Sequence, residues 1–240
     1  MPNRSNPAHP SRRRGFGTAA AQMVAVAMMF NAALGLSAGA ARAEAARPLR
    51  IVAFGDSLTA GFQLPPRDAF PAQLERALQA RGFAVEVINA GVSGDTTAAA
   101  LDRLAWSVPD GVDAAIVELG ANDALRGLDP DRARANLDTI VATFRRANAD
   151  VLIAGMIAPN NFGPAYAGKF NAMFADLAAK HGALLYPFFL DGVALKPRLS
   201  LADGMHPNAA GVAEIVARML PSVEQLIGRV KARQAVKSGG

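Results

Sequence analysis

Short apolar stretches alternate with longer amphipathic stretches from residue 49 onward. The apolar stretches are typical of buried strands, since they are brief, rich in branched side chains and bounded by polar or glycine-containing loops. They predict strands over residues 49–54, 85–89, 114–119, 151–156 and 184–188. Five strands, each followed by a helix, predict one α/β domain with a parallel sheet covered on both faces.

The segments between these strands carry apolar residues at helical spacing. Pro71 suits the first turn of the first helix, and Gly82 suits the position after its last turn. We expect Asp95 to cap the second helix and Pro221 to kink or split the last one. The predicted helices cover residues 70–81, 95–107, 129–148, 166–181 and 208–232. Right-handed crossovers then give a doubly wound sandwich, which binds ligands at the carboxyl ends of its strands.

The basic residues are unevenly distributed along the chain. The 240 residues include 25 Lys and Arg against 20 Asp and Glu, a formal net charge of +5. Residues 1–43 contain five arginines and no acidic residue, which leaves 20 basic and 20 acidic side chains in residues 44–240. The larger part of the chain is therefore neutral, and we expect no nucleic-acid partner.

The first 43 residues have the pattern of an export signal. Three arginines at 12–14 precede an apolar core over 23–36, and Ala41-Arg42-Ala43 fits the small-x-small cleavage pattern. The apolar core is shorter than the roughly 20 residues that span a bilayer, so we expect no integral membrane span in the mature chain. These features predict a cleaved signal over 1–43 and a single mature domain over 44–240, in the periplasm or secreted. A retained anchor, a second cut after residue 40 and twin-arginine export stay open.

The composition narrows the possible chemistry. The chain has no cysteine, which excludes disulfides, thiolate metal sites, a lipoprotein anchor and a cysteine nucleophile. Hydrophobic residues make up 51% of the chain and charged residues 19%, which excludes an intrinsically disordered protein. With no thiol available, we expect the nucleophile to be an oxygen.

Four polar clusters follow the predicted strands or precede the last helix. They are Gly-Asp-Ser-Leu-Thr at 55–59, Gly-Val-Ser-Gly-Asp-Thr at 91–96, Gly-Ala-Asn-Asp at 120–123 and Asp-Gly-Met-His-Pro-Asn at 203–208. The carboxyl ends of parallel strands meet at one edge of a sheet. We therefore expect the four clusters to form one site.

The residue types in these clusters suit acyl transfer. A serine hydroxyl such as that of Ser57 needs a base to take its proton, and the base needs a carboxylate that holds its tautomer. His206 and Asp203 lie three residues apart on one loop and can supply both. The backbone N–H groups of Ser57 and Gly94, with the side-chain amide of Asn122, can supply hydrogen bonds to a tetrahedral oxyanion.

These residues also carry a resemblance to a known family. In order along the chain, Ser57, Gly94, Asn122 and His206 match the four residues that name the SGNH (GDSL) hydrolases. The supporting stretches lie at 54–61, 89–96, 117–127, 195–197 and 203–208, within a match that covers most of 49–220. The departures are mild: Ala121 stands where a second glycine is common and can tighten the pocket, and Gly91 replaces another small residue.

The resemblance, which is strongest to the bacterial periplasmic thioesterase and lysophospholipase branch, implies a fold and an activity. The fold is a flavodoxin-like three-layer α/β/α sandwich with strand order 2-1-3-4-5. The activity is hydrolysis of acyl esters and thioesters by a Ser57-His206-Asp203 triad, without a cofactor or metal. The implied partner is a small-molecule acyl ester or thioester, and a monomer is expected.

Several alternatives remain open from the sequence alone. A carbohydrate O-deacetylase needs the same catalytic groups and a more open, polar groove. A non-catalytic flavodoxin-like module that binds a flavin is a second alternative, although it has no use for the Asp-x-x-His spacing. The apolar side chains nearest the clusters are equally compatible with an acyl groove and with ordinary packing: Leu125, Ile157, Phe162 and Tyr166.

Overall fold

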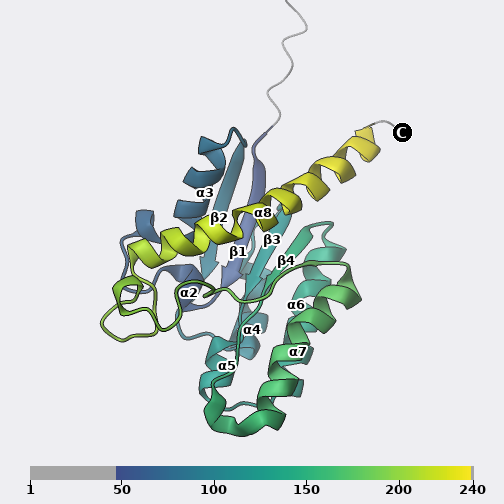
Figure 1. Ribbon diagram of the computed structural model, residues 1–240. Coiled ribbons are helices and arrows are strands. Elements are labelled where there is room, and N and C mark those ends of the chain that lie inside the picture. Colours follow the sequence, from purple (N-terminus) through teal and green to yellow (C-terminus); the bar gives the residue numbers. More distant parts are fainter. Residues whose placement is uncertain (1–46, 239–240) are drawn as a thin grey trace, which may run out of the picture. The chain divides into compact units, whose positions relative to one another are not determined.

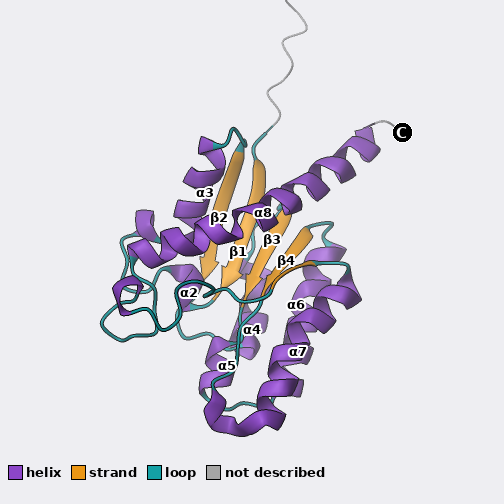
Figure 2. Ribbon diagram, in the orientation of Figure 1, coloured by secondary structure: helices purple, strands orange, loops and turns teal. Residues whose placement is uncertain are grey.

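The computed structural model describes residues 47–238, which fold around a five-stranded parallel sheet (Figures 1 and 2). The strands are β1 (Leu49–Gly55), β2 (Val85–Gly91), β3 (Ala114–Glu118), β4 (Asp150–Ala154) and β5 (Leu184–Tyr186). Their order across the sheet is β2-β1-β3-β4-β5. The predicted fold and strand order are confirmed. The predicted export signal and its cleavage site lie outside the described residues.

The central strands are buried on both faces, as their continuous apolar sequences predict. Every residue of β3 and β4 is buried, whereas β2, at the edge of the sheet, alternates between buried and exposed residues. The registers pair Gly55 with both Gly91 and Glu118, so β1, β2 and β3 end at the same level. The loops that follow these strands therefore start side by side.

Two layers of helices cover the sheet. The long helices are α3 (Phe70–Ala80), α4 (Thr97–Ser107), α6 (Pro130–Arg146), α7 (Gly163–His181) and α8 (Ala209–Ser238). Helix α3 packs against α8, and α6 packs against both α4 and α7 (Figure 1). None of the helices between residues 47 and 238 is long and apolar enough to span a membrane.

Several short helices lie in the loops at the carboxyl ends of the strands and were not predicted. They are α2 (Ser57–Ala60), α5 (Ala121–Leu125) and three 3₁₀ turns, η1 (Pro66–Asp68), η2 (Asn160–Phe162) and η3 (Pro197–Leu199). Helices α2 and α5 start within two of the predicted polar clusters. They are too short to show helical periodicity, and so the sequence pattern did not reveal them.

The predicted cap of one helix is wrong, and of the kink or split predicted at Pro221 the split does not occur. The cap of α4 is Thr96, whose hydroxyl accepts the N–H of Ala99, rather than Asp95, which binds Arg103 instead. Helix α8 is not split at Pro221 and continues to Ser238. A proline removes one helical hydrogen bond, but buried apolar residues on both sides of Pro221 hold the two halves against the core: Val216, Met219, Leu220, Val223, Leu226, Ile227 and Val230.

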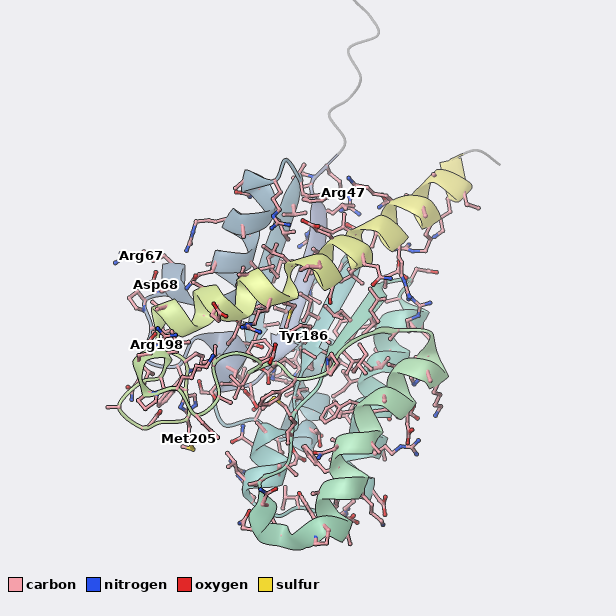
Figure 3. The ribbon with its side chains drawn as sticks, viewed as in Figure 1. Arg47, Arg67, Asp68, Tyr186, Arg198 and Met205 are labelled. Atoms are coloured by element: carbon pink, nitrogen blue, oxygen red, sulfur yellow. The ribbon has the colours of Figure 1, made fainter. Side chains whose placement is uncertain are left out.

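An ion-pair cluster closes the amino-terminal edge of the sheet, where Arg47 lies (Figure 3). Arg47 donates two hydrogen bonds to the Asp113 carboxylate, at 2.7 and 2.8 Å, and the Arg50 N–H donates a third at 2.9 Å. Arg233 of α8 pairs with Asp150 at 3.0 Å and also donates to the carbonyl of Asp113 at 3.1 Å. The cluster ties the end of α8 to β3 and β4.

The Asp113 carboxylate is stabilised by this cluster. Partial burial by itself raises its pKa, but the hydrogen bonds from Arg47 and the Arg50 N–H, with the charges of Arg47 and Arg233, lower the pKa overall. A carboxylate whose pKa is lower in the folded state contributes stability above its unfolded pKa. That contribution is lost as the pH falls through the folded pKa.

We therefore expect Asp113→Asn to lower the free energy of unfolding by about 1–3 kcal/mol at pH 7. The difference from wild type should shrink as the pH falls from about 3.8 towards the lower pKa of folded Asp113, because protons then bind more strongly to this carboxylate in the unfolded chain. Urea unfolding at pH 7 and pH 3 measures both values. Asp102→Asn, at an exposed position of α4, serves as the control and should have little effect. An equal loss at both pH values would contradict the electrostatic explanation.

Candidate active site

Three predicted residues from two distant segments form a chain of hydrogen bonds at the carboxyl edge of the sheet. Ser57 is the first residue of α2, directly after β1, and its Oγ lies 2.9 Å from Nε2 of His206. Nδ1 of His206 lies 2.6 Å from Oδ2 of Asp203. The structure thus brings together the nucleophile, base and carboxylate expected from the sequence, in the order that acyl transfer needs.

The loop before α8 holds the histidine and the aspartate in this geometry. Oδ1 of Asp203 accepts the backbone N–H groups of Met205 and His206 at 2.9 and 3.0 Å. The N–H groups of His206 and Met205, and then the His206 ring, lower the pKa of Asp203 to about 2. Asp203 is therefore ionised throughout the neutral range. The ring of Phe62 packs on the imidazole, with the ring centroids 4.4 Å apart.

The turn between β1 and α2 is built on a buried carboxyl group. Asp56 is fully buried and caps α2, accepting the N–H of Leu58 at 3.0 Å. Its other oxygen accepts the side-chain amide of Asn122 at 3.2 Å. Burial raises the pKa of Asp56 to about 6, although the bonds from Leu58 and Asn122 act the other way. The residue before Ser57 therefore orients the amide that was predicted to bind an oxyanion.

Asn122 is also positioned by the neighbouring residue in α5. Asp123 is buried and accepts the backbone N–H of Thr97 at 2.8 Å and its hydroxyl at 2.7 Å. These bonds join α5 to the first residue of α4. Asp56 and Asp123 thus support the loops around Ser57.

Gly94 lies on the loop between β2 and α4. Its φ of 89° is in the left-handed region, which favours glycine, and its carbonyl accepts a hydrogen bond from Arg126 at 3.0 Å. Gly94 is not among the residues that line the cavity beside Ser57. The structure therefore places Gly94 on the expected loop, and its role as an oxyanion donor stays a prediction.

Sequence reasoning missed a buried arginine that links two of these loops. The side chain of Arg103, in α4, donates to Asp95 at 2.6 Å and to the carbonyl of Gly55 at 2.9 Å. Its guanidinium also lies over the ring of Phe54, 4.3 Å from the centroid. Arg103 therefore connects the end of β1 to the loop that carries Gly94. In the sequence, an arginine within a helical pattern gives no sign of whether its side chain is buried or exposed to solvent.

A second missed group is Glu118, the last residue of β3. Glu118 is fully buried, and its Oε2 accepts the hydroxyl of Thr59 at 2.8 Å, while Oε1 has no hydrogen-bond partner. Burial, and after it the charge of Asp56, raises the pKa of Glu118 well above its ordinary value. In the sequence, the one sign of this buried group is an acidic residue at the end of an otherwise apolar strand.

An apolar cavity of about 330 Å³ opens beside Ser57 and His206. Its apolar lining comes from Leu58, Ala121, Ala124, Leu125, Met156, Ile157, Pro159, Phe188, Leu190, Ala194, Leu195 and Met205. Met205 lies on the loop before α8 (Figure 3). Leu125 and Ile157 line the cavity, as the acyl-groove hypothesis expects. Phe162 and Tyr166 do not line it and pack on each other instead, with their ring centroids 5.2 Å apart.

The described residues show no group of three or more His, Asp or Glu side chains that could hold a metal ion. The chemistry that the site supports comes from the aligned side chains of Ser57, His206 and Asp203, with hydrogen-bond donors nearby. This arrangement can activate a hydroxyl group and stabilise an anion that forms on a bound carbonyl.

Comparison with known proteins relates the chain to a family of acylhydrolases and to esterases. Residues 53–213 match the model of the GDSL-like lipase/acylhydrolase family. The chain is 37% identical to an arylesterase of Vibrio mimicus over 175 residues, 71% of this chain and 88% of the relative. It is 36% identical to thioesterase 1/protease 1/lysophospholipase L1 of Escherichia coli over 190 residues, 78% of this chain and 88% of the relative. The crystal structure of AlinE4, an SGNH-hydrolase family esterase, has a TM-score of 0.63 at 46% identity and covers 75% of this chain and 96% of its own.

The close packing beneath the Ser57 turn predicts that Gly55→Ala is destabilising. A β-carbon on Gly55 would collide with the side-chain oxygen of Thr59 and would lie 2.6 Å from the carbonyl of Glu118. We expect the free energy of unfolding to fall by about 1–3 kcal/mol, measured by urea unfolding. Gly168→Ala is the matched control, because a β-carbon there meets nothing within 4 Å, and it should be neutral or stabilising. Equal stability of the two variants would contradict the packing argument.

Proposed function

The chain belongs to the GDSL-like lipase/acylhydrolase (SGNH hydrolase) family of serine ester hydrolases, and we propose that it hydrolyses acyl esters and thioesters through an acyl-enzyme on Ser57. The observation that carries the proposal is the alignment of Ser57 Oγ, the His206 ring and the Asp203 carboxylate beside an apolar cavity. A hydroxyl held on a neutral imidazole is poised for attack on a carbonyl carbon.

The proposed reaction has two balanced halves. Ser57 Oγ attacks the substrate carbonyl while Nε2 of His206 takes its proton, and the ionised Asp203 stabilises the imidazolium. The tetrahedral intermediate collapses, the bond to the leaving alcohol or thiol breaks, and His206 returns the proton to that group. Water then adds to the acyl-enzyme by the same route, which releases a carboxylic acid and restores Ser57.

The oxyanion of each intermediate is proposed to accept hydrogen bonds from the N–H groups of Ser57 and Gly94 and from Asn122. An asparagine amide has two N–H groups. One N–H of Asn122 is directed to Asp56, which leaves the other to meet the substrate. A donor fixed in advance stabilises the developing charge without reorganisation when the reaction occurs.

The apolar lining of the cavity supports an acyl chain as the group bound beside Ser57. Leu125, Ile157, Leu195 and Met205 line it and are exposed, with 53–95% of each residue accessible to solvent. A carbohydrate O-deacetylase needs a polar groove, which this lining does not favour. A non-catalytic flavin-binding module gives no reason for the Ser57-His206-Asp203 geometry. The names of the relatives, an arylesterase and a thioesterase/lysophospholipase, agree with acyl substrates.

The proposed location follows from the charged and apolar pattern of the first 43 residues. We propose export to the periplasm or the medium, with cleavage after Ala43. The proposed working form is a monomer that acts on small acyl esters or thioesters without a cofactor.

The nucleophile is tested with a fluorophosphonate probe, which labels activated serines. We expect labelling of the wild type at Ser57 and none in Ser57→Ala, whose kcat for a p-nitrophenyl ester should fall by about 10⁴-fold or more. Ser222→Ala, on the far helix α8, is the control and should label and turn over like the wild type. Undiminished hydrolysis by Ser57→Ala would refute the mechanism.

The acyl cavity is tested by comparing acetyl and octanoyl p-nitrophenyl esters. Ile157→Ser removes three methyl or methylene groups from a half-exposed side chain of the lining and adds a hydroxyl. Because each group contributes about 0.8 kcal/mol when buried, we expect kcat/KM for octanoate to fall by about 5–15-fold and that for acetate to change less than about twofold. Leu128→Ser is the control, since Leu128 is exposed but lies outside this lining. Preference for acetate with no effect of Ile157→Ser would instead favour the deacetylase.

A further inference from the structure

Glu118 is a buried acidic group for which the proposed mechanism has no use. It pairs in register with Gly55, one residue before Asp56 and two before Ser57. Its Oε2 accepts the hydroxyl of Thr59 at 2.8 Å, so it reaches from β3 to the helix that Ser57 begins. The missing β-carbon of Gly55 makes room for this contact, since a β-carbon there would lie 2.7 Å from Oε2 of Glu118.

No cation among the described residues pairs with Glu118. The nearby buried cation, Arg103, directs its hydrogen bonds to Asp95, to Ser107 and to the carbonyl of Gly55. Oε1 of Glu118 is buried without a hydrogen-bond partner. An unpaired carboxylate in such a site is far more costly than a neutral carboxylic acid.

Two carboxyl groups, Glu118 and Asp56, therefore share the space under the Ser57 turn, and their surroundings differ. Asp56 accepts N–H groups from Leu58 and Asn122, which stabilise a negative charge. Glu118 accepts the hydroxyl of Thr59, which binds a neutral acid equally well. This bond and the backbone N–H groups of Asp56 and Thr59 lower the pKa of Glu118, but burial and the charge of Asp56 outweigh them and raise it. A single negative charge in this pair therefore resides on Asp56.

We propose that Glu118 is a positioning residue for Ser57 and that it acts as a neutral carboxylic acid. The inference rests on the proposed function of Ser57. The contact between Glu118 and Thr59 fixes the first turn of α2. Because Glu118 keeps its proton, the one negative charge of the pair lies on Asp56, which orients the Asn122 amide. A second charge beneath Ser57 would oppose the oxyanion that forms above it.

The surrounding charges are consistent with this assignment. Burial, and after it the negative charge of the neighbouring Asp56, raises the pKa of Glu118. His206 and Asp95 act on Asp56, with opposite effects on its pKa. The Arg103 charge faces the same turn but is paired with Asp95 at 2.6 Å.

The positioning role is tested by comparing Glu118→Ala with Glu118→Gln at pH 7. Glutamine has the shape of the neutral acid and can keep the bond to Thr59, whereas alanine removes it. We expect Glu118→Ala to lower kcat by about 10–100-fold with KM within about twofold of wild type, since misplacing a reacting group acts on the chemical step. Glu118→Gln should recover most of that loss. An unchanged kcat in Glu118→Ala, or a Glu118→Gln variant as impaired as Glu118→Ala, would overturn the proposal.

The protonation state is tested by urea unfolding of wild type and Glu118→Gln from pH 5 to pH 8. A carboxyl whose pKa is raised in the folded state loses stability as the pH rises from its unfolded value towards its folded one. The urea midpoint of Glu118→Gln should therefore rise relative to wild type across this range. Asp113→Asn is the matched control, and its difference from wild type should stay constant, because the pKa of Asp113 is lowered below this range.

A constant difference between Glu118→Gln and wild type from pH 5 to pH 8 would show that Glu118 is ionised throughout, and would overturn the proposal. This unfolding measurement does not depend on activity. Failure of the proposed function would appear separately, as probe labelling or hydrolysis that survives in Ser57→Ala.

Discussion

The turn that follows β1 must present a serine hydroxyl at the surface while the backbone beneath it stays buried. Most of the site depends on the hydrogen bonds that satisfy the buried groups of this turn. Buried backbone and carboxyl groups need partners. Here Asp56 caps α2, Arg103 binds the carbonyl of Gly55, and Glu118 contacts Thr59. Asp56 belongs to the turn itself, whereas Arg103 comes from α4 and Glu118 from β3, so these two contacts depend on the packing of α4 and β3 against the turn.

The same contacts place the other functional groups relative to Ser57. Asp56 orients Asn122, and Arg103 reaches Asp95, the residue after Gly94. The histidine, in contrast, is held by its own loop, in which Asp203 accepts two backbone N–H groups as well as the imidazole. The site is thus assembled from one network beneath the sheet edge and one self-contained loop. A polar network of this kind stabilises a single geometry only if its members are satisfied, which makes the unpartnered Oε1 of Glu118 the informative exception.

The amino-terminal and carboxyl edges of the sheet have different roles. At the amino-terminal edge, Asp113 binds Arg47, and Asp150 binds Arg233 of α8. These pairs are complete, and the pKa of Asp113 is lowered accordingly. At the carboxyl edge, the pKa values of Asp56 and Glu118 are raised, because burial there is not compensated by cations. Raised pKa values of this kind are typical of functional sites. Asp203, at the same edge, has a lowered pKa because the N–H groups of its own loop and the His206 ring stabilise its charge.

Sequence by itself determined the strand order through the family resemblance, and it determined the five strands and the loops that carry Ser57, Asn122, Asp203 and His206. These features depend on local pattern: continuous apolar runs, turn residues, and short spacings such as that between Asp203 and His206. Only the tertiary structure decided which groups support them. Asp95 became a partner of Arg103 instead of a helix cap, and α8 continued past Pro221, because packing between distant elements outweighs local preference. Glu118 and Thr59 lie 59 residues apart in sequence and meet through strand pairing alone.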